Sequence, residues 1–133
     1  MNTQKYVIAS LGASVWLFVY GFVANAIILM DYWTANSSPG LMRPEGTEIM
    51  WAIVAAMVIQ GFALGYIFTK NFEAKGVGEG VRFGLLIAWF MAGIYFMVYA
   101  LQPIEMGPMF VGILTDGIGY VGAGAVLAML YKK

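Results

Sequence analysis

The chain has 133 residues, of which 62% are hydrophobic and 11% are charged, and its formal net charge is zero. A soluble domain has about 45–50% apolar and about 25% charged residues, so the composition indicates one membrane domain. The zero net charge gives no support for nucleic-acid binding. Because the sequence has no Cys and no His, it lacks disulfides, thiolate nucleophiles, imidazole bases, the usual zinc ligands and the Cys or His ligands of haem.

Four long apolar stretches are predicted to cross the membrane, and three loops join them. A helix rises about 1.5 Å per residue, so about 20 residues cross a hydrocarbon core of roughly 30 Å. The predicted spans are 6–30, 49–69, 83–101 and 109–131, the outer loops are 31–48 and 102–108, and the cytoplasmic loop is 70–82. We therefore expect residues 1–133 to form a single all-α transmembrane domain, a four-transmembrane-helix bundle.

The first span also has the layout of a signal peptide. Lys5 precedes an apolar run, and Ala24, Asn25 and Ala26 form an A-x-A cleavage motif. The run is longer than the h-region of a signal peptide, which favours a membrane span. The outer loop that follows contains the turn-forming residues Pro39, Gly40, Pro44 and Gly46.

The two halves of the chain show a faint duplication. The first and third spans align at Gly21 and Gly93, and the second and fourth spans align at Ala63 and Ala125. Two parallel helix-hairpin repeats would give this pattern. Apolar helices also resemble one another by chance, so both interpretations stay open.

The distribution of Lys and Arg predicts the orientation. Only Arg43 lies on the side of the predicted outer loops. Six basic residues lie on the other side, namely Lys5, Lys70, Lys75, Arg82, Lys132 and Lys133. Short cytoplasmic loops carry an excess of Lys and Arg, so we expect a multi-pass protein of the bacterial inner membrane with both termini in the cytoplasm. The outer side then carries the acidic residues Asp31, Glu45, Glu48 and Glu105.

Small residues are concentrated in the fourth span and at one place in the second. Helix backbones approach closely in lipid where residues are small. The predicted packing glycines are Gly61 and Gly65 in the second span and Gly112, Gly117, Gly119, Gly122 and Gly124 in the fourth. We therefore expect the fourth span at the centre of the bundle.

Asp116 in the fourth span is the sharpest candidate for a functional residue. A carboxylate near the bilayer centre costs about 2.5–3.5 kcal/mol, so intramembrane acids are usually paired or functional. Counting along the helices places Asn25, Tyr95 and Asp116 in one layer, at roughly 10 Å from the outer edge. This layer is either a ligand or proton-relay site that opens outward, or a polar clasp that fixes helix register. Gln60, near mid-membrane, is either a further candidate or an interhelical hydrogen-bonding residue.

Other motifs are weaker. The sequence from Gly117 to Gly122 has the form G-x-G-x-x-G, but it lies inside a lipid-spanning run without the preceding strand that dinucleotide binding requires. Met106 and Met109 are two of several outer methionines whose thioethers could bind Cu(I). Without Cys or His this set is weak, and we expect no metal and no cofactor.

The layout resembles the small four-span inner-membrane proteins of bacteria, a group without an assigned activity. The resemblance rests on Glu79-Gly-Val-Arg-Phe-Gly84, Gln102-Pro103 and Asp116-Gly-Ile-Gly-Tyr120. It implies a fold and a location but no activity. Small multidrug exporters share the size and span number but carry an essential Glu in the first span, where this chain has only Ser10, Ser14 and Asn25 as polar residues.

These patterns predict a non-enzymatic structural or accessory membrane subunit. No pair of acids has a spacing that suggests hydrolysis, and no Ser lies near a base. The expected partners are membrane lipids and further copies of the chain or other membrane subunits, and no nucleic acid. The alternative is a small transporter or channel that uses Asp116 and Asn25.

Overall fold

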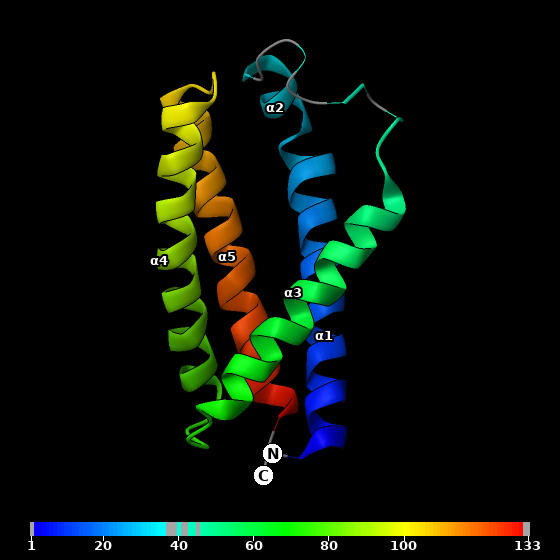
Figure 1. The fold of residues 1–133 in the computed structure, drawn as a ribbon, viewed down its shortest axis with the longest axis vertical. Coiled ribbons are helices and arrows are strands. Elements are labelled where there is room, and N and C mark those ends of the chain that lie inside the picture. Colours follow the sequence, from blue (N-terminus) through cyan, green and yellow to red (C-terminus); the bar gives the residue numbers. More distant parts are fainter. Residues whose placement is uncertain (1, 37–39, 41–42, 45, 132–133) are drawn as a thin grey trace.

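The computed structural model describes residues 2–36, 40, 43–44 and 46–131, and every element in this part of the chain is a helix (Figure 1). The elements are α1 (Thr3–Gly21), the π-helix η1 (Phe22–Ile28), α2 (Met30–Asn36), α3 (Met50–Lys70), α4 (Val77–Leu101) and α5 (Met106–Leu130). Pro39, Glu45, Lys132 and Lys133, to which the sequence analysis gave roles, lie outside the described residues.

Four helical segments are long and apolar enough to cross a membrane. They are Thr3–Ile28, Met50–Lys70, Val77–Leu101 and Met106–Leu130. The predicted fold class, an all-α transmembrane four-helix bundle, is confirmed. The chain is a multi-pass membrane protein.

Several boundaries differ from the prediction, since α1 begins at Thr3 and α5 at Met106, and two of the differences concern whole predicted loops. The predicted outer loop starts at residue 31, but the chain is helical from Met30 to Asn36, where the Asn36 amide donates to the Tyr32 carbonyl at 2.9 Å. The third span is predicted from residue 83, whereas α4 begins at Val77. The charged residues near its start suggested a loop, but a helix that extends beyond the hydrocarbon core can carry them in its first turns.

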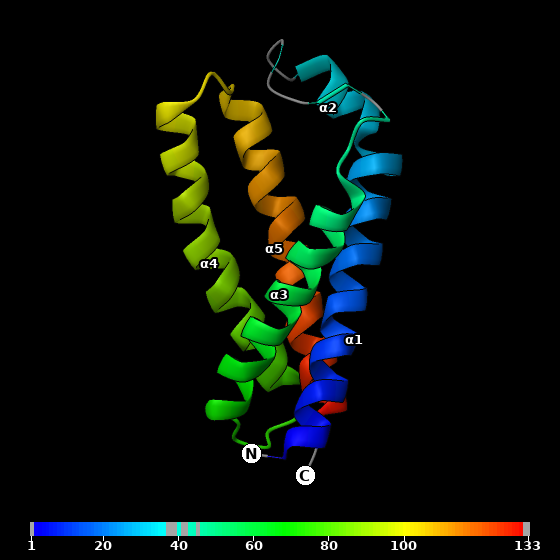
Figure 2. The same cartoon turned by 45° about the vertical axis from the view of Figure 1, so that its right-hand side comes forward.

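The helices form two antiparallel hairpins joined through α5. α1 packs against α3, α4 packs against α5, and α5 also packs along α1 (Figures 1 and 2). Both chain ends lie beside the α3–α4 connector, at what we call the terminal end. α2 and the α4–α5 turn lie at the opposite end, which we call the α2 end. The α4–α5 hairpin diverges from α1 toward the α2 end (Figure 2).

The buried core lies toward the terminal end. Its largest fully buried side chains include Phe68 and Leu127. The core cluster is formed by Ala9, Ala13, Leu17, Leu64, Phe68, Ala123, Leu127, Ala128 and Tyr131. Four of these nine residues are alanines of α1 and α5, and their small size allows the two helices to come close.

The two hairpins have the same order of helices, but they do not pack against each other in equivalent ways. A two-fold repeat predicts that α3 packs on α4 as α5 packs on α1. Contacts between α3 and α4 are sparse in the described residues, although the Phe68 and Phe83 rings meet at 5.5 Å. The internal duplication therefore stays a prediction.

Candidate functional site

The Asp116 carboxylate is bound across the α4–α5 interface. The Tyr95 hydroxyl of α4 donates a hydrogen bond to Asp116 Oδ2. Gly112, one helical turn before Asp116, provides the space for the tyrosine, because a Cβ at this position would lie 2.7 Å from a Tyr95 ring carbon. The small size of Gly112 thus allows the Tyr95 phenol to reach the intramembrane carboxylate of Asp116.

A small pocket with both polar and apolar lining residues lies on another side of Asp116, between α1–η1, α3 and α5. Its volume is about 140 Å³. The lining residues are Leu17, Tyr20, Gly21, Asn25, Met57, Gln60, Asp116, Gly119 and Tyr120. The pocket brings together three of the predicted site residues, Asn25, Gln60 and Asp116. The fourth, Tyr95, is outside the lining and reaches the site through Asp116.

Asn25 is held by its own element. Its Nδ2 donates to the Gly21 carbonyl at 3.1 Å, and its Oδ1 accepts from Trp33 Nε1 at 3.0 Å. The surrounding backbone is a π-helix, which is rare and occurs often at functional sites. Among the hydrogen bonds of the described residues, none joins Asn25 to Asp116, so these two side chains share a pocket without forming a clasp.

Two aromatic residues of α1 fix α5 next to the pocket. Trp16 Nε1 donates to the Gly119 carbonyl at 2.8 Å, and the Tyr20 hydroxyl donates to the Thr115 carbonyl at 2.7 Å. Their rings stack at 5.3 Å. A Cβ at Gly122 would overlap the Trp16 ring, so the glycine is needed for this arrangement. The sequence analysis gave Trp16 and Tyr20 no role, although their spacing of four residues places both on one helix face.

The glycines of the second span lie against serines of α1. A Cβ at Gly61 would overlap Ser14, and a Cβ at Gly65 would overlap Ser10. Ser14 donates to the Ser10 carbonyl at 2.9 Å, which keeps its hydroxyl satisfied within its own helix. These small residues explain how α1 and α3 approach closely at the terminal end.

The closest backbone approach involves two glycines that the prediction missed. Gly80 and Gly84 of α4 lie against the carbonyl groups of Gly124 and Tyr120 in α5. Gly80 was assigned to the connector, so the G-x-x-x-G spacing at the start of α4 was overlooked. By contrast, Gly117 has room for a side chain, because its Cβ would make only an ordinary contact of 3.6 Å with Ala88.

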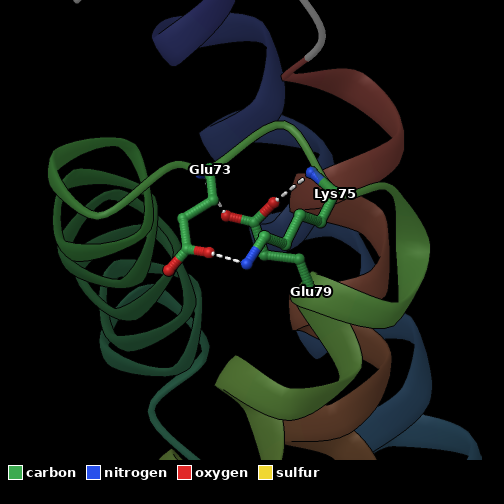
Figure 3. A network of polar contacts seen from close by, with 3 residues as sticks. All are labelled: Glu73, Lys75 and Glu79. Atoms are coloured by element: carbon green, nitrogen blue, oxygen red, sulfur yellow. Dashed lines mark hydrogen bonds and ion pairs between the residues drawn. The ribbon is translucent and has the colours of Figure 1, made fainter.

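A second polar cluster lies in the α3–α4 connector (Figure 3). The Glu79 carboxylate, in the first turn of α4, accepts backbone N–H bonds from Glu73 at 2.6 Å and Lys75 at 2.9 Å. Ala74, between them, has a φ of 61°, a left-handed conformation that lets the flanking N–H groups converge. Glu79 thereby ties the connector to the first turn of α4.

The Glu73 side chain forms an ion pair with Lys75 at 2.5 Å. The hydrogen bond and the positive charge of Lys75, with a smaller contribution from Arg82, hold the pKa of the Glu73 carboxyl below its usual range. Both partners of the ion pair are more than half exposed, so the pair contributes little to stability.

The potential metal ligands are taken from the described part of the chain only. This part contains no group of three His, Cys, Asp or Glu residues that could hold a metal ion. The two methionines considered as copper ligands lie in different environments, because Met109 is buried and Met106 is exposed.

No family model matches the chain, and no curated protein or solved structure matches it. The resemblance to small four-span bacterial proteins therefore stays a prediction. Function is inferred from the arrangement of side chains, because a four-helix membrane bundle alone implies no activity.

The arrangement around Asp116 can bind a hydrogen-bond donor or a cation. Tyr95 occupies one carboxylate oxygen, and the same carboxyl group also borders the pocket with the Gln60 amide. An acid with access to a polar pocket can also exchange a proton. Among the described residues, neither tyrosine of the pocket lining, Tyr20 or Tyr120, is hydrogen-bonded to a basic side chain, as an activated nucleophile would require.

Proposed function

We propose that the chain is a non-enzymatic subunit of a membrane assembly, either a homo-oligomer or a larger complex of the bacterial inner membrane. The observation that supports this proposal is the incomplete enclosure of Asp116. The carboxylate is half-buried and borders a pocket between three helices. A polar residue from a neighbouring subunit would complete the enclosure.

The energetic argument concerns the groups in that pocket. A carboxylate facing hydrocarbon costs about 2.5–3.5 kcal/mol, and uncompensated amides add to the cost. The Tyr95 hydrogen bond is one compensation, and such bonds within membranes contribute about 0.6 kcal/mol on average. The remaining cost favours an arrangement in which the pocket is covered by protein.

The exposed surface of α4 supports the same proposal. Only 6% of the most apolar window of α4 is buried, compared with 33% for α5. Large side chains cover this exposed surface, including Leu86, Trp89, Phe90, Met97 and Leu101. A surface of this kind can contact either lipid or another subunit, and it leaves α4 available for assembly.

The second candidate function is a small transporter or channel. The specific observation in its favour is that three polar residues of the mixed pocket lining, Asn25, Gln60 and Asp116, come from three different helices. Intramembrane acids beside amides are typical of ion and proton pathways. Under this hypothesis water, rather than protein, would fill the pocket.

The proposal is tested by intact mass spectrometry of the protein extracted gently from its native membrane, comparing the wild type with Asp116→Asn. Asp31→Asn is the matched control, because it makes the same chemical change at an exposed position of α2. The subunit hypothesis predicts a stoichiometric assembly that dissociates more readily in Asp116→Asn alone.

Liposome flux assays on the same three proteins separate the two hypotheses. An intact assembly combined with lost cation or proton flux in Asp116→Asn would support the transporter. If assembly, thermal stability and flux are all unchanged, both roles of Asp116 are contradicted.

A further inference from the structure

A second and larger cavity lies at the terminal end of the bundle, between the end of α3 and the start of α4. Its volume is about 610 Å³. The lining residues are Phe68, Asn71, Glu73, Lys75, Glu79, Arg82, Phe83 and Leu86. It has no residue in common with the Asp116 pocket, so an inference from it stands independently of the proposed function.

The cavity is divided into an apolar and a polar part along the helix direction. Leu86 and Phe83 lie farther into α4, while Arg82 and the connector residues lie nearer the end of the bundle. α4 has 25 residues and is about 37 Å long, which exceeds a hydrocarbon core of roughly 30 Å. The polar part of the cavity therefore lies at the depth of lipid headgroups, and the apolar part lies at the edge of the hydrocarbon.

The apolar part continues along an exposed face of α4. Leu86, Phe90 and Met97 follow one another at intervals of four and seven residues, which places them on the same face. Each of these side chains is at least 60% exposed. Because α3 makes few contacts with α4, no neighbouring helix of this chain covers that face in the described structure. An acyl chain can therefore lie along α4 below a headgroup in the cavity.

The charges in the cavity indicate the kind of headgroup. Glu73 and Glu79 balance Lys75 and Arg82, so the lining is neutral overall. The Glu79 carboxylate is occupied by two backbone N–H groups, and Lys75 pairs with Glu73 Oε2. Among the described contacts, no hydrogen bond or ion pair involves the Arg82 guanidinium or Glu73 Oε1, so the guanidinium can bind a phosphate and this oxygen can accept from an ammonium group.

We propose that this cavity is a binding site for a phospholipid whose headgroup carries both a phosphate and a primary ammonium, such as phosphatidylethanolamine. Arg82 binds the phosphate, because a guanidinium donates paired hydrogen bonds to phosphate oxygens. Glu73 binds the ammonium. A phospholipid without the ammonium, such as phosphatidylglycerol, can bind Arg82 through its phosphate but has no group that pairs with the Glu73 carboxylate.

The test is native mass spectrometry of the purified full chain, titrated with phosphatidylethanolamine and phosphatidylglycerol of identical acyl chains. We expect the wild type to prefer phosphatidylethanolamine. Arg82→Gln should weaken binding of both lipids by about tenfold, the loss expected for one charge-assisted contact. Glu73→Gln should abolish the preference between the lipids. Lys70→Gln is the matched control for Arg82→Gln. Lys70 is a cation at the same end that lies over the Tyr66 ring and outside the cavity lining.

Two further measurements distinguish a loss of lipid binding from a loss of folding. Thermal unfolding of each variant shows whether Arg82→Gln has damaged the fold, and Arg82→Lys, which keeps the charge, should retain part of the binding. Glu73 is exposed in the connector, so Glu73→Gln should leave the fold intact. Equal binding of the two lipids by the wild type, or equal effects of Arg82→Gln and Lys70→Gln, would overturn the proposal.

Discussion

The two ends of the bundle are built in different ways. At the terminal end, small residues allow backbones to touch, as where Gly84 of α4 lies against the Tyr120 carbonyl of α5. Toward the α2 end, the α4–α5 hairpin diverges from α1, and polar contacts such as the Tyr95–Asp116 hydrogen bond occur beside apolar ones such as Phe96–Phe110. The core cluster lies almost entirely on the first side of this division.

This difference indicates that the two ends of the bundle have different roles. Close packing of small residues gains dispersion energy and holds the helices in one register. Polar groups in a loosely packed region cost stability and are retained where they bind something, since functional regions are usually drawn from the less stable parts of a fold. We infer that the terminal end carries the stability and that the region around Asp116 carries the function.

Gly84→Ala should have the largest effect on stability. A Cβ at this position would lie 2.5 Å from the Val121 Cα and would overlap the Tyr120 carbonyl, so α4 and α5 must separate. Overpacking against backbone should cost about 3 kcal/mol in the free energy of unfolding. The control is Gly93→Ala on the same helix, where nothing lies within 4 Å.

Gly93→Ala should leave stability unchanged or raise it by about 0.5–1 kcal/mol, the ordinary advantage of alanine over glycine in a helix. Denaturant unfolding in mild detergent measures both variants. Equal free energies of unfolding for Gly84→Ala and Gly93→Ala would contradict the claim that glycine packing holds the terminal end together.

Glu79→Gln should have the next largest effect. The change removes the charge and one of the two oxygens that accept the backbone N–H groups of Glu73 and Lys75. We expect a loss of about 1–2 kcal/mol, the cost of losing a hydrogen bond to a charged acceptor. Glu73→Gln is the control, because the Glu73 carboxylate is exposed and accepts no backbone bond in the described contacts. A loss as large in Glu73→Gln would show that the connector charge, rather than the backbone hydrogen bonds to Glu79, matters.

Tyr95→Phe tests the region around Asp116 and should change stability only slightly. The ring still fills the space beside Gly112, and the lost hydrogen bond should cost about 0.6 kcal/mol. Tyr99→Phe removes a hydroxyl one turn along the same helix and serves as the control. If Tyr95→Phe destabilised the protein as much as Gly84→Ala, the proposed division between the two ends would be wrong.

The Glu73–Lys75 ion pair should show the smallest effect, and its pH dependence has a defined sign. Because the pKa of Glu73 is lowered in the folded protein, the stabilisation is present at neutral pH and is lost as the pH falls through that lowered pKa. Lys75→Gln should therefore melt slightly below the wild type at pH 7 and together with it at low pH. A difference that grows on acidification would contradict this account.

The helices could be predicted from the sequence because long apolar runs have few alternative structures in a membrane. The early start of α4 at Val77 could not, because Glu79 and Arg82 resemble loop residues until the hydrogen bonds between Glu79 and the connector are known. The helical segment from Met30 to Asn36 was missed for a similar reason, since polar residues concealed a short helix.

The site was partly predictable. Helix depth placed Tyr95 and Asp116 at the same level, and the structure joins them. Depth says nothing about rotation around a helix axis, so it could not show that Asn25 is held by Trp33. It also could not show that Gln60, on α3, shares the pocket with Asp116, because that depends on how the helices are arranged around α5.

The most direct test of the central claim asks what fills the Asp116 pocket in the native membrane. The chain has no cysteine, so Gln60→Cys introduces a single reactive thiol in the pocket lining, and Ile59→Cys gives a control on the exposed side of the same helix. We predict that Gln60→Cys cross-links to a neighbouring chain and resists a membrane-impermeant maleimide. Rapid maleimide labelling of Gln60→Cys without cross-linking would show a water-filled pocket and contradict the account.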